Sequence, residues 1–397
     1  MRCAVGLSTQ GRSDAAIAEV VERLGTRAEG DGDDLAVIFS SPDHADHLDR
    51  FSRILSERGL GRNVIGCTGE SIIGEDREIE GQPALAIWTA RLPGNSIVPL
   101  EFPPSDGVFP TLPDTDAATL LLLADPFTFS ADRWFKELVA NGSKLRVVGG
   151  MASGSQVPGQ NRFVLNGKLV KSGGVGVLLS GGVAIRTVVS QGCRPIGKPL
   201  IVTKAEQNLI RELGRRPALD VLRELFQELD EDDRERVQAG LHVGRVINEY
   251  QESFGRGDFL VRNVMGVDDS GAVVITDLAK VGQTVQFHVR DAETATEDLR
   301  ALLTETRIDH PRSRVGGALI FSCNGRGTRL FEGANHDVSM VREVLGPIPV
   351  AGFFAMGELG PVGGENFVHG FTASNVLFEE TSELEPGQVD PADKAAF

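Results

Sequence analysis

An internal repeat constrains the fold of this chain more than any other feature of its sequence. A strand-like apolar run, an amphipathic helical pattern and a second apolar run that ends in glycine occur in this order three times, in residues 35–70, 119–155 and 316–360. Self-similarity of this kind marks a chain built from duplicated supersecondary units. The fold should therefore contain one structural unit in three copies.

The apolar runs predict how each unit is built. Runs such as LAVIFS, TLLLLA and GALIFS are short and continuous, which is typical of strands buried on both faces. A strand-helix-strand passage normally places its two strands in parallel through a right-handed crossover. Because a further strand-like run follows in each copy, we predict the α/β fold class, with mixed β-sheets built from repeated strand-helix-strand-strand units and two sub-domains. The loops that follow the strands should gather at one edge, around a common cleft.

A helical connector is predicted between the second and third copies. Residues 204–213 read as one helix, and Pro217 then opens another whose apolar residues are spaced three and four apart. We place the domain boundary here, which gives an N-terminal domain of residues 1–215 and a C-terminal domain of residues 216–380. Turn-forming residues between alternating apolar runs predict a hairpin in residues 258–277.

Two segments lack the pattern of a packed element. Residues 102–116 are rich in proline and aspartate and are predicted to form a surface loop. Residues 381–397 are polar and are predicted to form a mobile tail. In a protein that works purely as an interaction module, either segment would be the place to recruit a partner.

Composition and charge exclude several classes of function. The chain has 397 residues, of which 41% are hydrophobic and 24% charged, so it is long enough to bury full-sized cores. Its net charge of −16 would repel a nucleic acid backbone. The N-terminus does not read as a secretory signal, and no apolar segment reaches about 18 residues. We therefore predict a cytoplasmic protein that binds neither nucleic acid nor membrane.

The sequence indicates no metal and no cofactor. Its four cysteines are scattered without CxxC spacing and read as free thiols. The close pair His44 and His47 has no carboxylate cluster to complete a ligand set. The GxG at Gly325 lacks the third glycine and the acidic residue of a dinucleotide fingerprint.

Four strings of residues carry a family resemblance. They are VIGCTGESIIG (64–74), DFLVRNVMGVDDSGAVVITDLAKVGQTVQFHVRD (258–291), GALIFSCNGRGTRLF (317–331) and AGFFAMGELGPVGGENFVHGFTASNVLF (351–378). Together they resemble the hallmarks of the FIST domain family, and the resemblance runs from about residue 30 to residue 380, over both the N-terminal and the C-terminal FIST halves.

The resemblance implies a sensory input module. In other members such a module is joined to signalling outputs, and the suggested ligands are small molecules such as amino acids. No output domain is visible in this sequence, so a sensory role would require a separate signalling protein as partner, or an oligomer.

The first candidate ligand-binding loop is CNGRG, at the end of a predicted strand. It contributes Cys323, Asn324, Gly325, Arg326 and Gly327. Its glycines free the backbone N–H groups, which together with the guanidinium of Arg326 would suit an anionic group such as a carboxylate. A tight turn with Arg326 in a salt bridge is the alternative.

The second candidate loop, FFAMGELGPVGGENF, contributes Phe354, Met356, Gly357, Glu358 and Asn366. An apolar lining with one carboxylate would hold an ammonium group, so Glu358 opposite the guanidinium of the first loop would bind a zwitterion. In the alternative reading the aromatic residues belong to the core and Glu358 caps a turn.

The equivalent loop of the first copy, GCTGE, adds Cys67, Gly69 and Glu70, with Glu70 in the place of the carboxylate of the third copy. An enzymatic alternative uses Cys323 as nucleophile and His336 as base, although no third orienting residue is identifiable. We expect a small-molecule-binding sensory protein rather than an enzyme.

Overall fold

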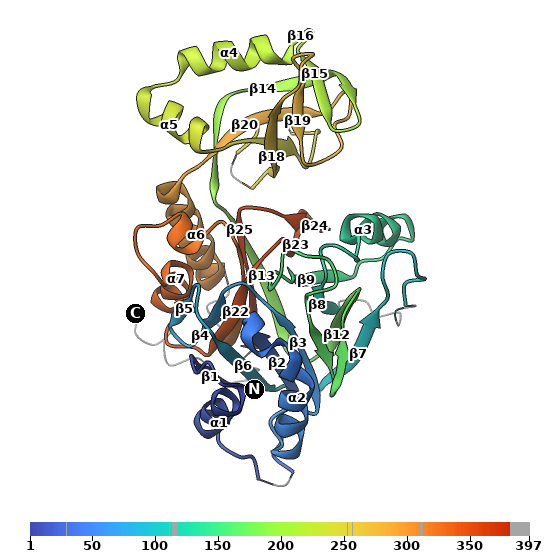
Figure 1. The fold of residues 1–397 in the computed structure, drawn as a ribbon, viewed down its shortest axis with the longest axis vertical. Coiled ribbons are helices and arrows are strands. Elements are labelled where there is room, and N and C mark those ends of the chain that lie inside the picture. The colour runs from blue at the N-terminus through green and yellow to red at the C-terminus, as the bar shows by residue number, and fades with distance from the viewer. Residues whose placement is uncertain are drawn as a thin grey trace, which may run out of the picture.

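The computed structural model describes residues 1–381 apart from residues 29, 111, 113–117, 252, 256 and 310–312. These residues form a larger body of three six-stranded sheets, and a smaller barrel-like unit built on a seven-stranded sheet stands on top of it (Figure 1). The predicted tail and part of the predicted loop at residues 102–116 lie outside the described residues.

The body contains the predicted unit in three copies, and the predicted fold class is confirmed. In each copy the first two strands are parallel and a later strand runs antiparallel to the first. The elements of the three copies are β2 (Leu35–Ser40), α2 (Leu48–Glu57), β3 (Asn63–Thr68) and β6 (Leu85–Arg91); β8 (Thr119–Ala124), α3 (Ala131–Ala140), β9 (Arg146–Met151) and β12 (Gly174–Gly181); and β21 (Ser313–Cys323), α7 (His336–Leu345), β22 (Val350–Ala355) and β25 (Thr372–Thr381).

Each sheet is completed by a hairpin from another copy. The hairpin lies between the second and the last strand of its own copy. That of the first copy pairs with the third copy, that of the second pairs with the first, and that of the third pairs with the second. These hairpins are β4 (Ile72–Gly74) with β5 (Arg77–Ile79), β10 (Phe163–Leu165) with β11 (Lys168–Val170), and β23 (Glu358–Val362) with β24 (Glu365–His369). The exchange is cyclic, so the copies interlock around one centre.

The remaining elements of the body flank these sheets. One further strand pairs antiparallel with the last strand of each copy. These strands are β1 (Arg2–Ser8), β7 (Asn95–Phe102) and β13 (Ala184–Gln191), and the remaining helices are α1 (Ser13–Leu24), α6 (Ala292–Asp309) and the short 3₁₀ helices η1 (Pro42–His47) and η2 (Gly327–Arg329).

The glycine at the second strand of each copy has a steric cause. A Cβ atom on Gly66, Gly149 or Gly352 would lie 2.6, 1.9 or 1.8 Å from a carbonyl oxygen of the neighbouring parallel strand. Only glycine permits an approach this close. This requirement explains why the second apolar run of every copy carries glycine.

The body has a common core at its centre. The ring of Phe39, from the first copy, lies 6.1 Å from that of Phe321 and 5.5 Å from that of Phe353, both from the third. All three side chains are fully buried, in a cluster that also includes Val148 of the second copy. The third copy therefore packs with the first two.

The barrel-like unit lies between the second and third copies in sequence. It leaves the body after Gln191 and returns at Arg290 (Figure 1). Its elements are β14 (Cys193–Glu206), β15 (Leu209–Leu213), β16 (Arg216–Pro217), α4 (Ala218–Glu228), α5 (Glu231–Ala239), β17 (Leu241–Val246), β18 (Phe259–Val267), β19 (Val273–Ile275) and β20 (Thr284–Arg290).

The prediction of a helix in residues 204–213 is wrong, because this segment consists of the end of β14, a tight turn and strand β15. Gln207 adopts φ +52° between the paired residues Glu206 and Leu209, a left-handed conformation that a helix interior does not contain. The helix predicted after Pro217 is present as α4, and the predicted hairpin is β18–β19. The predicted domain boundary falls inside the seven-stranded sheet.

Candidate functional site

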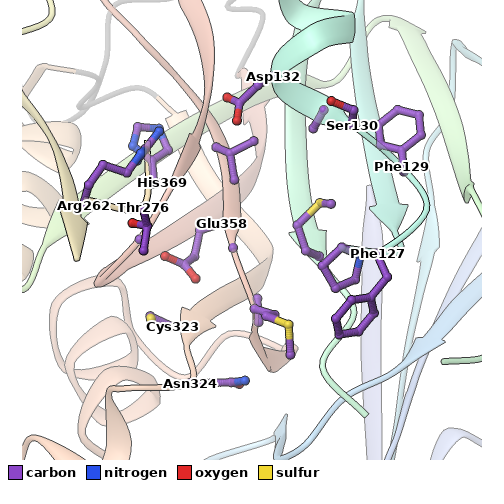
Figure 2. Close-up of a pocket in the computed structure, with 18 of the residues that line it drawn as sticks. Phe127, Phe129, Ser130, Asp132, Arg262, Thr276, Cys323, Asn324, Glu358 and His369 are labelled. Carbon is purple, nitrogen blue, oxygen red and sulfur yellow. The ribbon is translucent and has the colours of Figure 1, made fainter. Parts of the chain in front are cut away.

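A pocket of about 810 Å³ lies between the body and the barrel. Its walls come from three places: the strand ends of the third copy, the segment that leads into α3 in the second copy, and strand β18 of the barrel with Thr276. In Figure 2, Glu358, Cys323 and Asn324 lie across the cavity from Phe127 and Phe129.

The loops after the second strands of the first two copies meet at β22 of the third copy. The backbone N–H of Glu70 donates to the hydroxyl of Ser153 at 2.9 Å, and this hydroxyl donates to the carbonyl of Phe354 in β22. The N–H of Phe354 in turn donates to the carbonyl of Ser71 at 2.9 Å. All three copies therefore contribute to a single hydrogen-bonded cluster.

The structure brings together five of the candidate residues in the pocket wall. They are Cys323, Asn324, Met356, Gly357 and Glu358.

The other candidates lie outside the wall. Phe354 and Cys67 are buried in the core, and Gly69 packs against the ring of Phe353. The amide of Asn366 joins β24 to the second copy, through Val147 N at 2.8 Å and Leu145 O at 2.7 Å.

The loop after β21 is occupied by the protein's own groups. The Gly325 carbonyl accepts from Arg290, and Glu70 forms an ion pair with Arg329. Glu80 accepts from the N–H of Thr328 at 3.0 Å and from its hydroxyl at 2.7 Å, and it lies against Gly327.

Glu358 is the most unusual group of the pocket. Its side chain is fully buried, and Oε2 accepts from the Thr372 hydroxyl at 2.7 Å and from its N–H at 3.2 Å. No N–H or O–H group of the described residues donates to Oε1; the thiol of Cys323, a weak donor, lies beside the carboxyl and lowers its pKa slightly. Burial raises the pKa of Glu358 to about 8, against the opposing effect of the Thr372 hydrogen bonds. The carboxyl is thus a neutral acid at neutral pH, and a cation beside it would favour its ionisation.

Arg326 does not face the pocket, which corrects the predicted pairing of Arg326 with Glu358 across a ligand. Its Nε and Nη2 donate to the carboxylate of Asp337 at 2.8 and 2.7 Å, and each residue is only 1% exposed. The pKa of Asp337 is held low, because the nearby guanidinium outweighs the effect of burial. A buried cation requires such a partner, so the anion that this loop binds is Asp337.

The geometry gives no nucleophile-base pair at Cys323. Burial, and the charge of Glu358 after it, raise the pKa of the Cys323 thiol to about 12, which suppresses the reactive thiolate. The two ring nitrogens of His336 lie 2.9 Å from Asp337 Oδ1 and 2.9 Å from Thr296 Oγ1. Both nitrogens are therefore engaged away from the thiol.

Sequence reasoning missed the polar residues on the opposite side of the pocket. Asp132 is exposed in the first turn of α3, and Arg262 lies on β18, where its Nε donates to Asp277 at 3.2 Å. Asp132 could have been found by following the repeat, because it begins the helix of the second copy. Arg262 and Thr276 carried no signal, since they come from the barrel.

The described part of the chain contains no cluster of three or more His, Cys, Asp or Glu side chains that would hold a metal ion. Among its helices, none has the length and apolar character needed to cross a bilayer.

Comparison with known proteins gives matches over most of the chain. The family model of the FIST N domain matches residues 34–216, and that of the FIST C domain matches residues 218–361. A Mycobacterium tuberculosis protein described as uncharacterized is 40% identical over 383 residues, which cover 95% of this chain and all of the relative. An uncharacterized protein of Mycobacterium bovis is 40% identical over 389 residues, covering 96% of this chain and all of the relative.

Proposed function

The chain belongs to the FIST family, whose domains are associated with sensory signal transduction, and we propose that it senses a small molecule bound in the pocket between the body and the barrel. The observation that carries the proposal is the carboxyl of Glu358, fully buried in the pocket wall with one oxygen unpartnered among the described residues. A buried polar atom without a partner costs about 1–3 kcal/mol. A ligand that donates to this atom would recover that cost.

The acceptors in the pocket favour a ligand with an amino group. Besides Oε1 of Glu358, the side-chain oxygen of Asn324 is buried without a hydrogen bond to any described residue. The exposed carboxylate of Asp132 adds negative charge at the other wall. An ammonium group supplies three donors and one positive charge, so it suits acceptors of this kind and would draw Glu358 into its ionised form.

The pocket also offers a group for an anionic end. The guanidinium of Arg262 lies in its wall. A guanidinium favours a carboxylate, which it can bind through two N–H groups. We therefore propose an amino acid or a related amine-bearing metabolite as the ligand.

Thermal unfolding in the presence of each of the twenty amino acids tests the proposal. A ligand at a hundred times its Kd stabilises the folded state by about 2.7 kcal/mol, which gives a measurable rise in Tm. Glu358→Gln should abolish the rise, since a neutral amide cannot pair with an ammonium group. Glu365→Gln is the matched control, because Glu365 is exposed on the neighbouring strand β24. A rise in Tm that survives Glu358→Gln would overturn the proposal.

We propose that the signal leaves through the barrel. The main chain passes between the barrel and the body at Gln191–Cys193 and at Arg290–Asp291. A ligand in the pocket contacts both units, so its binding would bias their relative position. A separate signalling protein would then recognise the ligand-bound arrangement.

A further inference from the structure

We propose that the ligand is a short linear peptide with a free amino end and a free carboxyl end. This inference rests on the proposed function, because it places the amino end of the peptide at Glu358. It extends the binding site beyond the first pocket into a neighbouring hollow.

The second hollow, of about 670 Å³, lies between α3 and residues 275–278 of the barrel. It shares Ser130, Asp132 and Thr276 with the first pocket, so the two form one continuous cleft. Pockets of about 300–1,000 Å³ enclose drug-sized ligands, and each hollow alone lies in that range. A single amino acid would fill only part of the first, whereas an extended peptide would occupy both.

The charges along the cleft match the two ends of a peptide. The buried carboxyl of Glu358 lies in the first hollow, and the exposed ammonium of Lys136 lies in the second. Lys136 forms no ion pair with another described residue, whereas Glu137 beside it is bound to Arg133 at 3.0 Å. An amino end at Glu358 and a carboxyl end at Lys136 would each meet an opposite charge. The second hollow also contains the carboxylates of Asp277, which is paired with Arg262 at 3.2 Å, and of Asp132, which lines both hollows.

An edge strand offers hydrogen-bonding groups to the main chain of the peptide. Val368 and His369 of β24 form part of the wall of the first hollow, and β24 is the last strand of its sheet in the described residues. An edge strand presents main-chain donors and acceptors to which an extended peptide adds as a further strand. His369 is paired with Glu358 of β23 in the sheet. A strand added at the free edge would therefore have β24 between it and Glu358, and the amino end of the peptide would have to pass the end of β24 to reach the carboxyl.

The apolar wall of the first hollow offers a contact surface for the side chains of the peptide. Phe127, Phe129, Met151 and Met356 line it. In an extended peptide successive side chains point to opposite sides, so every second side chain would enter this wall.

The test uses the full chain and three equimolar pools, of the twenty free amino acids, of random dipeptides and of random tripeptides, each with free ends. Thermal unfolding ranks the pools, and calorimetry measures an apparent Kd for each pool. We expect the tripeptide pool to bind at least about tenfold more tightly than the amino acid pool. N-acetylation should abolish binding. C-amidation of the peptide and Lys136→Ala should each weaken binding by a similar factor, and combining them should weaken it no further. Lys144→Ala, which removes another exposed lysine, is the control.

The outcomes separate this inference from the proposed function. If free amino acids bind as tightly as tripeptides and Glu358→Gln abolishes their binding, the peptide inference fails and the proposed function stands. The same inference is overturned if Lys136→Ala weakens amidated and free-acid peptides alike. Absence of binding by all three pools would overturn both.

Discussion

Thr372 donates both its hydroxyl and its backbone N–H to the same oxygen of Glu358, at 2.7 and 3.2 Å, and so leaves the other oxygen to the pocket. The residue before it, Phe371, has φ +65° and packs its ring 4.2 Å from that of His242 in the barrel. One short turn therefore links the carboxyl group that we assign to ligand binding with the unit that we propose transmits the signal.

Glu358→Gln should change how stability depends on pH. The pKa of Glu358 is about 8 in the folded protein against an ordinary value of 4.5, so between these values the folded state binds more protons than the unfolded state. The contribution of Glu358 to the free energy of unfolding then falls as pH rises from 4.5 to 8. Glutamine has no proton to lose, so the variant should gain stability relative to the natural protein, by a few kcal/mol at pH 8 and little at pH 4.5.

Urea unfolding at pH 5, 6.5 and 8 measures this difference. The contribution of the buried histidines cancels because the variant is compared with the natural protein at each pH. Glu78, whose pKa burial and the charge of Asp337 also raise to about 8, should keep part of the slope in the variant. A difference between the two proteins that does not change with pH would contradict the assignment.

Removal of Arg326 should be costly, because it leaves the carboxylate of Asp337 buried without its cation. We expect Arg326→Met to lower the free energy of unfolding by about 3–5 kcal/mol and the double variant Arg326→Met/Asp337→Leu to recover much of this loss. Arg329→Met is the control, since its ion pair with Glu70 is partly exposed and should cost about 1 kcal/mol or less. If the double variant is as unstable as the sum of the single ones, the two residues do not act as a pair.

The structure shows which parts of this fold a sequence can predict. The units are local, so their periodicity predicted three copies of parallel strands correctly. The exchange of hairpins between copies left no such pattern, because pairing of β4 with β22 joins residues that lie about 280 positions apart. At the site, the glycines and strand ends of two loops led to the pocket residues Cys323 and Glu358. The role of Arg326 could not be predicted in this way, because it depends on Asp337, which the first turn of α7 places next to the guanidinium.

A methyl group added at Gly352 should destabilise the third copy strongly. Its Cβ would lie 1.8 Å from the carbonyl oxygen of Ile320, so the parallel strands β21 and β22 would have to separate. We expect Gly352→Ala to cost at least about 3 kcal/mol, at the severe end of single substitutions. Gly333→Ala, where the added atom meets nothing within 4 Å, should be nearly neutral. Chemical denaturation measures the free energy of unfolding of both variants. Equal values would show that β21 and β22 can separate to accept a Cβ atom at position 352.

Cys323 should react slowly with iodoacetamide. A pKa of about 12 instead of 9.0 lowers the thiolate fraction at pH 8, and with it the alkylation rate, by about a thousandfold. In a Cys3→Ser background, mass spectrometry of the digested protein follows this one site. Glu358→Gln removes the charge that adds to the effect of burial, so it should speed the reaction, while His336→Ala should leave it unchanged. A slower reaction after His336→Ala would favour the enzymatic alternative.

Phe371→Gly should separate ligand binding from its effect on the barrel. Glycine adopts a positive φ without strain, so Thr372 can still hold Glu358, but the ring that packs against His242 is lost. We expect Kd for the bound amine to change by less than about tenfold, and ligand-induced protection of β17 and β18 from hydrogen exchange to disappear. Phe254→Ala is the control, since it removes another ring from the same apolar cluster without touching the turn. Protection that persists in Phe371→Gly would mean that the ligand orders the barrel through its direct contacts with Arg262 and Thr276.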